Sequence, residues 1–377
     1  MTEPRYDVIA IGNAIVDVMA PCSDELIDEL QLNKGGMTLV DDEGAAMLYD
    51  AMGPAREISG GSAANTLAGM AALGAQCAFI GQVAKDQLGD VFSHDIRAVG
   101  IDFDTPSRDG QPSTARCLIF VTPDGERSFT SPKIITADET LRVEEVDLSQ
   151  IDRAEMMLFG TNQMVTPKLR DAAMLALRTA HNRDRFVAFD PNIRLHLWDD
   201  TRRVLPCMNE AIPNVDLVKL NDEEIEMLGR GMSAEQLYTE WFEPAGVTAL
   251  IATYASGGAE VFCGDFRLSV DAPNVEVVDT TGAGDGFVAG VLSAICGLTE
   301  DMKLRSSRAL RARLRAWDEE TWRHILNLGC FVGSHVCTTL GATTGLPTLD
   351  QVPKHLSPKG SKVPVTQACL AEVKSTT

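Results

Sequence analysis

The sequence lacks several patterns that are typical of membrane, secreted, disulfide-rich or zinc-binding proteins. No run of about 18 apolar residues occurs, so no membrane-spanning helix is expected. Residues 1–13 lack a basic stretch ahead of a long apolar stretch, which disfavours a signal peptide. No C-x-x-C pair is present and the number of cysteines is odd, so neither a disulfide framework nor a zinc site is expected and a reducing cytoplasm is favoured. The nine cysteines are scattered at positions 22, 77, 117, 207, 263, 296, 330, 337 and 369.

Positive charge is also scarce. The chain of 377 residues has a formal net charge of −21, and 45% of its residues are hydrophobic, enough for a sizeable core. Such a chain repels nucleic-acid phosphates, so no nucleic-acid partner is expected. A bound anionic ligand would need a cation or a concentrated set of backbone N–H donors. The pattern G-x-x-x-x-G-K-[ST] is absent, which excludes a P-loop kinase of the usual form.

Short apolar runs alternate with helical patterns along most of the chain. Strands are predicted at 6–12, 77–81, 116–122, 186–190, 215–220, 248–253 and 275–279, and helices at 61–73, 167–180, 222–228 and 286–296. This alternation predicts an α/β fold with a mostly parallel sheet and helices on both faces. Ligands of such folds bind beyond the carboxyl ends of the strands. Residues 351–377 are rich in Pro, Lys, Ser and Thr, so we expect an irregular tail there.

The segment 275–295 is the strongest candidate for chemistry. Its predicted strand leads through Gly282, Ala283 and Gly284 to a helix start, where free N–H groups and the helix dipole favour an anion. Asp285 lies at the edge of this turn, where a carboxylate could accept a hydroxyl proton. An ordinary glycine-containing turn and a loose dinucleotide-binding turn are the alternatives, although an aspartate inside the turn would repel a pyrophosphate.

The Asp279–Asp285 segment, DTTGAGD, and the small-residue helix after it resemble the C-terminal signature of the ribokinase-like (PfkB) carbohydrate kinase family. The N-terminal signature is matched in order and spacing by the segments 60–65, 73–74 and 80–89. The resemblance spans roughly residues 6–348. The family includes fructokinase, ribokinase and adenosine kinase members. It implies a kinase domain over 1–350 with a small β lid, which we place at about 36–58 and 101–131.

The resemblance implies roles for particular residues. Asp285 would be the catalytic base, and the amides of Gly282, Ala283 and Gly284 would hold the transferring phosphoryl group. The substrate would contact Asp17, Gly60, Gly61, Asn65, Asn192 and Arg194. ATP would contact Asn221, Thr253, Gly258 and the helix that carries Cys330. Two departures from the family pattern are Ala255, which replaces a glycine, and Cys330, which stands where the family usually has asparagine.

The resemblance also implies cations. Glu224, in the N-x-x-E motif that begins at Asn221, would organise Mg²⁺, often through water. Asp279 and Thr281 resemble the monovalent-cation site of some members, and the use of K⁺ is left open. Helix capping by the same polar residues is the alternative at 221–224. The segment 303–315 holds six basic residues and no acidic one, which indicates either a solvated helix face or a site for phosphate steering or a partner.

These features predict an ATP-dependent kinase that phosphorylates a hydroxymethyl group of a sugar. The segment 189–198 resembles fructokinase and keto-sugar kinase members, which favours a sugar. A nucleoside is the alternative substrate, because the start of the chain resembles adenosine kinases. A non-catalytic binding protein and a nicotinamide dehydrogenase are alternatives of other classes. A homodimer is compatible with the resemblance.

Overall fold

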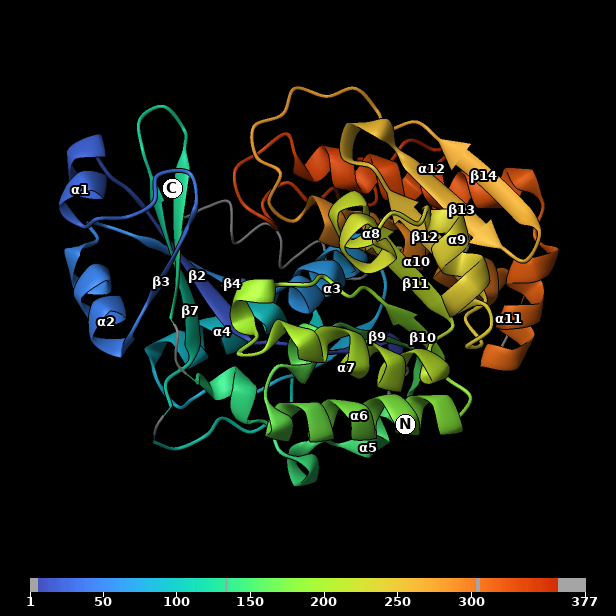
Figure 1. Ribbon diagram of the computed structural model, residues 1–377, viewed down its shortest axis with the longest axis horizontal. Coiled ribbons are helices and arrows are strands. Elements are labelled where there is room, and N and C mark those ends of the chain that lie inside the picture. The colour runs from blue at the N-terminus through green and yellow to red at the C-terminus, as the bar shows by residue number, and fades with distance from the viewer. Residues whose placement is uncertain (1–5, 111, 133–134, 303–305, 359–377) are drawn as a thin grey trace.

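The computed structural model describes residues 6–110, 112–132, 135–302 and 306–358. Two sheets organise this part of the chain, a large one in the main body and a smaller one beside it (Figure 1). The large sheet is mostly parallel and helices cover both of its faces, so the expected α/β fold is confirmed.

The main sheet has nine strands. In spatial order they are β14 (Phe266–Val270), β13 (Ala259–Cys263), β12 (Ala249–Thr253), β11 (Leu217–Asn221), β10 (Phe186–Phe189), β9 (Ala154–Phe159), β1 (Tyr6–Ile11), β5 (Cys77–Ile80) and β6 (Ile101–Asp102). All pairs from β12 to β6 are parallel, and β13 and β14 add an antiparallel edge. The central strands read as short apolar runs because both faces of a parallel sheet are buried.

Helices form a layer on each face of the main sheet. One layer contains α3 (Ser62–Ala72), α4 (Gln87–Ala98), α10 (Ala283–Met302), α11 (Ser307–Ala316) and α12 (Glu319–Val336). The other contains α5 (Leu148–Asp152), α6 (Pro167–Asn182), α7 (Val204–Ala211), α8 (Asp222–Gly229) and α9 (Ala234–Leu237). Strand β1 shows the alternation, since Val8 and Ala10 pack into the first core while Ile9 and Ile11 pack into the second.

Small residues let α10 and α12 approach closely. A Cβ on Gly290 would lie 2.6 Å from the Leu328 carbonyl oxygen, and a Cβ on Gly329 would lie 2.8 Å from Val291. The two helices therefore pack nearly backbone to backbone. This contact fixes the start of α10, where the phosphoryl site is predicted, against the C-terminal part of the chain.

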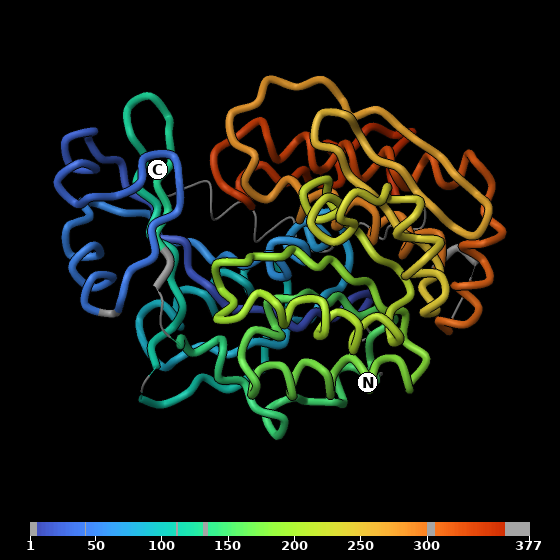
Figure 2. The backbone as a smooth tube through the Cα atoms, viewed as in Figure 1, coloured from blue at the N-terminus to red at the C-terminus, as the bar shows by residue number. Residues whose placement is uncertain are grey.

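The second sheet has the order β3 (Met37–Val40), β8 (Arg127–Pro132), β7 (Ala115–Val121), β2 (Ile15–Pro21) and β4 (Arg56–Gly60). Helices α1 (Asp24–Glu29) and α2 (Asp42–Ala51) lie in the same part of the molecule (Figure 2). The segments predicted as a lid contribute β3, β7, most of β8 and the first part of β4. Two details differ from that prediction: β6 belongs to the main sheet, and β2 joins the second sheet.

The predicted strand at 275–279 is wrong. Residues 271–282 form an irregular connection, shown in orange in Figure 2, and the side chains of Val277 and Val278 are 59% and 54% exposed. Its backbone meets the end of α12 instead of a strand, through the Val278 N–H to the Cys337 carbonyl oxygen at 2.8 Å. The β-branched residues favour extended backbone, but no strand of the sheet pairs with them here.

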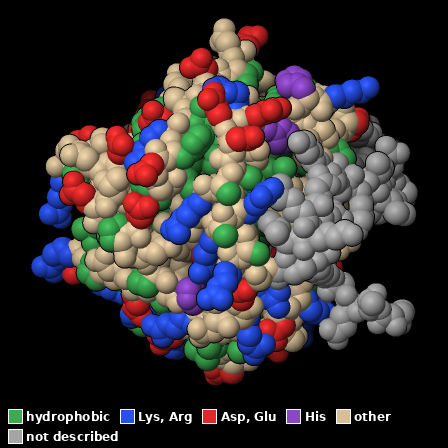
Figure 3. All heavy atoms as spheres, turned by 90° about the vertical axis from the view of Figure 1, so that its right-hand side faces the viewer, with side chains coloured by type: hydrophobic (Ala, Val, Ile, Leu, Met, Phe, Trp, Pro, Cys, Tyr) green, Lys and Arg blue, Asp and Glu red, His purple; other side chains and the backbone are tan. Residues whose placement is uncertain are grey.

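The first three residues of the basic segment 303–315 lie outside the described part. The rest of the segment forms most of α11. Leu310 and Leu314 are buried, and Arg311 forms an ion pair with the buried Asp216 just before β11. That contact lies at the amino end of β11, whereas the predicted site lies at the carboxyl end. Figure 3 looks onto the side of the molecule that carries α11 and shows Lys and Arg side chains gathered there.

The predicted tail at 351–377 is only partly described. Residues 351–358 form turns, and 359–377 lie outside the described part. Within the described ranges no helix has the length and apolarity to cross a membrane. No disulfide joins the eight cysteines of the described part.

Candidate active site

Asp285 lies in the first turn of α10. The helix begins at Ala283 rather than at Gly286 as predicted, so the carboxylate belongs to the helix start itself. Gly282, just before the helix, has φ +81°, and a Cβ there would lie 2.8 Å from the backbone of Ala342. Glycine is required at this position by both its conformation and its close contact. The Ala283 N–H already donates to the Thr280 carbonyl oxygen at 3.1 Å, so this amide is engaged in the turn.

Two side chains of α3 hold the Asp285 carboxylate. Ser62 Oγ donates to Oδ1 at 2.6 Å, and Asn65 Nδ2 donates to Oδ2 at 3.0 Å. Burial raises the pKa of Asp285, while these two hydrogen bonds act in the opposite direction. The Oδ1 atom of Asn65 is buried and has no partner among the described residues. The N-terminal and C-terminal signatures therefore meet in one hydrogen-bonded unit, and an acceptor remains beside the predicted base.

Lys219 of β11 places a positive charge beneath this turn. Its Nζ lies 3.4 Å from Asp190 Oδ1, and both side chains are at most 9% exposed. A Cβ at position 284 would lie 3.5 Å from the same Nζ. Burial lowers the pKa of Lys219, but the carboxylates of Asp190, Glu224 and Asp285 outweigh burial and raise it. The lysine thus remains charged among three acidic side chains.

The loop after β10 is held in a constrained conformation. Asn192 has φ +44°, a left-handed conformation that asparagine tolerates better than most residues. Thr161 donates from both N and Oγ1 to the Pro191 carbonyl oxygen, at 3.0 and 2.6 Å. Arg194 is exposed, and its positive charge is close enough to Asp285 to lower the pKa of that carboxyl group. The loop therefore brings Arg194 to the site.

Glu224 fastens the same loop. Its Oε1 accepts the Ile193 N–H and its Oε2 accepts the Asn221 N–H, both at 2.9 Å, and its side chain is buried. Asn221 in turn caps α8, with Oδ1 accepting the Glu224 N–H at 2.8 Å. Capping by these residues, the alternative to a magnesium role, is thus observed. A role for Glu224 in organising Mg²⁺ stays a prediction.

Asp17 of β2 faces the same region from the second sheet. A Cβ at Gly60 would lie 2.7 Å from Asp17 Oδ2, so glycine at position 60 leaves room for this carboxylate. Burial raises the pKa of Asp17 to about 6, nearby Arg127 lowers it, and Asp285 raises it further. Gly61 has φ +97°, and a Cβ there would lie 2.4 Å from the Asn13 carbonyl oxygen. Both glycines are therefore required by close contacts.

A polar network extends from Asn13 at the carboxyl end of β1. Asn13 Nδ2 donates to Asp138 Oδ2 at 2.6 Å, and Gln163 Nε2 donates to Asn13 Oδ1 at 2.7 Å. Thr136 Oγ1 donates to the other oxygen of Asp138 at 2.5 Å. Burial raises the pKa of Asp138, and the hydrogen bonds from Thr136 and Asn13 lower it. Polar groups from three separate segments therefore extend the polar region around Asp17 and Gly61. We call this whole region, which the substrate is predicted to contact, the acceptor region.

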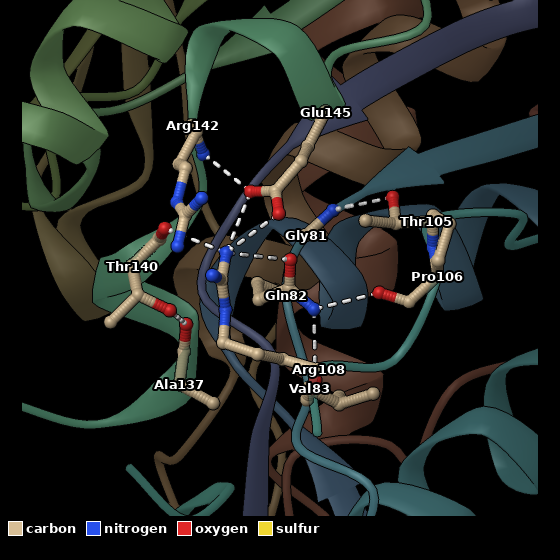
Figure 4. Close-up of polar contacts among 10 residues, drawn as sticks. All are labelled: Gly81, Gln82, Val83, Thr105, Pro106, Arg108, Ala137, Thr140, Arg142 and Glu145. Carbon is tan, nitrogen blue, oxygen red and sulfur yellow. Dashed lines mark hydrogen bonds and ion pairs between the residues drawn. The ribbon is translucent and has the colours of Figure 1, made fainter. Parts of the chain in front are cut away.

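A second network holds the short helical turn that carries Asp138. Arg108 Nη2 donates to the carbonyl oxygen of Thr140 at 3.0 Å and to both oxygens of Glu145, at 2.9 and 2.6 Å (Figure 4). Gln82, which belongs to the N-terminal signature, donates to the carbonyl oxygens of Val83 and Pro106. These contacts join the loops that contain Gln82 and Arg108 to residues 137–145. They therefore hold in place the helical turn that carries Asp138.

The predicted cation residues are already engaged. Asp279 Oδ1 accepts the N–H and the hydroxyl of Thr281, at 3.0 and 2.8 Å. Asp279 Oδ2 accepts the Gly341 N–H at 2.7 Å and forms an ion pair with Arg127 Nη1 at 2.7 Å. Arg127 belongs to β8, so this pair joins the second sheet to the turn before α10.

The predicted nucleotide residues lie at the carboxyl ends of β11 and β12 and on α12. Thr253 ends β12, and its Oγ1 donates to the Leu220 carbonyl oxygen at 3.4 Å. Gly258 has φ +90°, and a Cβ there would lie 2.0 Å from the Val270 carbonyl oxygen. Ala255 has φ +48°, the conformation that the usual glycine would adopt without strain. Cys330 is buried on α12, and burial raises the pKa of its thiol to about 12, so the thiol stays protonated near neutral pH.

Several residues of this region were not predicted as site residues from the sequence, among them Ser62, Lys219 and Arg127, and the polar group formed by Asn13, Asp138 and Gln163. A lysine inside the apolar run 215–220 was a usable signal, because a charged side chain in a buried strand needs partners. Ser62 and Arg127 gave no such signal, since their contacts join positions 223 and 152 residues away in the chain.

The arrangement has the parts of a site for phosphoryl transfer. A buried carboxylate lies at a helix N-terminus beside a buried ammonium group, and the polar side chains of Asp17, Asn65 and Asn13 lie in the same region. Within the described residues no three His, Cys, Asp or Glu side chains are grouped to hold a metal ion. Mg²⁺ is commonly bound by one or two carboxylates together with substrate phosphates, and its use by this protein stays a prediction. The fold and the site define a small-molecule kinase.

The chain belongs to the pfkB family of carbohydrate kinases, whose model matches residues 42–349. It is similar to the probable fructokinase-6, chloroplastic, of Arabidopsis thaliana, with 30% identity over 79% of this chain and 74% of that protein. A probable sugar kinase from Rhizobium etli is 35% identical, with a TM-score of 0.71 over 91% of this chain and 97% of that one. An adenosine kinase from Sinorhizobium meliloti is also 35% identical, with a TM-score of 0.69 over 90% and 95%.

These comparisons confirm the predicted family and kinase class. They give no support to a nicotinamide dehydrogenase or to a non-catalytic binding protein. The roles of individual site residues stay predictions.

Proposed function

We propose that this protein transfers the γ-phosphoryl group of ATP to a hydroxymethyl group of a sugar, with Asp285 as the base. The observation that carries the proposal is the unit formed by Asp285, Ser62 and Asn65. It joins the helix start that suits an anion to the segment predicted to contact the substrate. A hydroxyl placed there would lie beside a carboxylate of raised pKa, and a base of raised pKa works closer to neutral pH.

In this mechanism the chain's own residues bind, orient and shield the reactants. Asp17 accepts hydrogen bonds from sugar hydroxyls, and Asn65 Oδ1 accepts a further one. The N–H groups of Gly282 and Gly284 at the start of α10, together with the ammonium group of Lys219, stabilise the charge of the transferring phosphoryl group. The second sheet acts as the lid that excludes water. Mg²⁺, organised by Glu224 and Asn221 through water, would supply charge neutralisation at the phosphates.

Two features favour a sugar. The acceptor region continues through Asn13, Asp138 and Gln163, which are hydrogen-bonded polar groups suited to a hydroxylated ligand. The curated relatives at about 30% identity are fructokinases. Fructose, ribose and keto-sugars are therefore the first substrates to examine.

A nucleoside is the second candidate. The adenosine kinase of Sinorhizobium meliloti matches this chain at the same identity as the probable sugar kinase of Rhizobium etli. The ribose of a nucleoside would occupy the position proposed for the sugar and meet the same polar network.

ADP release with Mg-ATP tests the proposal and separates the two candidates. The panel is fructose, ribose, 2-keto-3-deoxygluconate, adenosine, inosine and cytidine. We expect turnover with one of the sugars and at least tenfold lower kcat/KM with the nucleosides, which corresponds to about 1.4 kcal/mol of transition-state binding. Turnover confined to nucleosides would favour the second candidate, and no turnover with any acceptor would contradict the proposal.

The remaining expectations belong to the same proposal. The protein would work with Mg-ATP in a reducing cytoplasm, without nucleic-acid or membrane partners. A homodimer remains compatible with it. Light scattering of the purified chain measures the oligomeric state directly.

A further inference from the structure

Donors from the described residues already occupy the Asp279 carboxylate. A carboxylate offers about four lone-pair positions for hydrogen bonds. Asp279 receives four donors, which are the Thr281 N–H, the Thr281 hydroxyl, the Gly341 N–H and the Arg127 guanidinium. A metal ion at this carboxylate would have to displace one of them.

Among the residues that the structure describes, Arg127 supplies the positive charge that pairs with Asp279. Its Nη1 lies 2.7 Å from Asp279 Oδ2 and 3.4 Å from Thr281 Oγ1. The side chains of Arg127 and Asp279 are 7% and 8% exposed, so the pair is shielded from water. A monovalent cation predicted at Asp279 and Thr281 would carry the same charge to the same two residues. The guanidinium and such a cation therefore compete for one place.

The position of Asp279 explains why a charge is needed there. Its carboxylate bonds both to Thr281, immediately before Gly282, and to Gly341, immediately before Ala342. Gly282 and Ala342 are in direct contact, since a Cβ on Gly282 would lie 2.8 Å from Ala342. Asp279 thus joins the two segments that set the position of the turn before α10. Without a partner charge this buried carboxylate would be strongly destabilised.

Arg127 is not a saturated structural arginine. Its Nε and Nη2 atoms are buried and have no hydrogen-bond partner among the described residues. Burial of unpaired donors costs free energy. The ion pair with Asp279 therefore holds Arg127 in a position where two of its nitrogen atoms lack hydrogen bonds. It is also carried by β8, so its charge reaches the turn only when the second sheet lies against the main body.

We propose that Arg127 takes the place of a monovalent cation at Asp279, so that the kinase works without K⁺ and its phosphoryl-binding turn is completed by docking of the second sheet. Arg127 is a positioning residue in this account, because it acts through Asp279 on the turn. The inference rests on the proposed kinase activity. Its failure is distinguishable from failure of that activity, because thermal stability provides a readout that needs no turnover.

The test compares the parent protein with Arg127→Ala in K⁺, Na⁺ and tetramethylammonium chloride at equal ionic strength. The parent should show the same kcat and the same melting temperature in all three salts. Arg127→Ala should lose about 10- to 100-fold in kcat, the size expected for a charged hydrogen bond. Its kcat and melting temperature should recover in K⁺ or with added guanidinium, but not in tetramethylammonium, because only a small cation or a planar donor fits the vacated place.

Arg116→Ala is the matched control. Arg116 lies on β7 of the same second sheet, and its guanidinium is 5.2 Å from the centre of the Tyr49 ring. Its removal should leave kcat, melting temperature and the response to salts as in the parent.

Three results would overturn the proposal. One is a parent protein activated several-fold or thermally stabilised by K⁺. Another is an Arg127→Ala variant that turns over like the parent in tetramethylammonium. The third is an Arg127→Ala variant that loses activity and is rescued by neither K⁺ nor guanidinium. If the parent turns over no acceptor, the proposed function fails, and the melting temperatures still decide whether Arg127→Ala gains a cation site.

Discussion

Replacing Lys219 with methionine should destabilise the protein in a way that depends on pH. Lys219 and Asp190 lie 3.4 Å apart with side chains at most 9% exposed, and the Lys219 charge also acts on Glu224 and Asp285. Removing one partner of a buried ion pair costs about 3–5 kcal/mol. Methionine preserves most of the side-chain length, so the expected loss comes from charge rather than from a cavity. This loss is a large part of the 5–15 kcal/mol typical of folded domains.

The sign of the pH dependence follows from the carboxylates. Burial raises the pKa of Glu224, and Lys219 lowers it. Without the lysine, the folded state binds protons more tightly than the unfolded state does, so the free energy of unfolding falls as pH rises. The deficit of Lys219→Met relative to the parent should therefore be larger near about pH 8 than near about pH 6.

Urea unfolding followed by circular dichroism at both pH values measures the effect. Lys168→Met is the matched control, since Lys168 is exposed on α6 and its replacement should change stability by less than about 0.5 kcal/mol. The double variant Lys219→Met, Asp190→Asn should recover part of the loss, because it removes one of the uncompensated carboxylates. A Lys219→Met protein as stable as the parent at both pH values, or one that loses more at low pH, would refute the reasoning.

Two further predictions concern the substrate region. With the preferred sugar, kcat/KM should fall as pH decreases below about 6, because burial raises the pKa of Asp17 to about 6 and the protonated acid is a weaker acceptor for sugar hydroxyls; a profile that stays flat to about pH 5 would contradict this role of Asp17. Gly61→Ala should cost at least about 1–2 kcal/mol in unfolding free energy, because alanine disfavours φ +97° and its Cβ would lie 2.4 Å from the Asn13 carbonyl oxygen. Gly53→Ala, with nothing within 4 Å of its added Cβ, is the matched control and should be nearly neutral; equal stabilities of the two variants would count against the conformational requirement at position 61.

Local patterns were enough to predict five of the nine described strands of the main sheet, namely β1, β5, β10, β11 and β12, whereas β6, β9, β13 and β14 were not predicted. The apolar runs that became β1, β5, β10 and β12 are buried on both faces, so their hydrophobicity reported their position directly. The segment 275–279 has a similar composition but failed as a strand, because strand formation depends on a neighbour with which to pair. That neighbour is determined by the course of the whole chain and is not visible in five residues.

The site was predictable to the extent that its residues are adjacent in the sequence. The turn at Gly282–Gly284, Asp285 and the glycine-rich segment at Gly60 all lie in short motifs. Residues that act across the fold were missed. Arg127 follows an ordinary turn sequence, and only the folded structure brings it to Asp279. The predicted use of that carboxylate by a cation took no account of this arginine.

The lid prediction shows a similar limit. Most of the second sheet comes from the two predicted segments, but β2 entered it because Ile15–Pro21 pairs with both β4 and β7. Its alternation of buried and partly exposed side chains is typical of a sheet with one covered face. That strand matters because it carries Asp17, which we propose contacts the substrate.

The central claim is that Asp285 removes the proton of the attacking hydroxyl during phosphoryl transfer from ATP. The most direct test is the turnover of Asp285→Asn with the preferred sugar, measured together with ATP affinity by calorimetry. The account predicts that kcat falls by about 10²- to 10⁴-fold, the usual contribution of a general base, while ATP affinity stays close to that of the parent. Turnover of Asp285→Asn near the parental rate would contradict the claim.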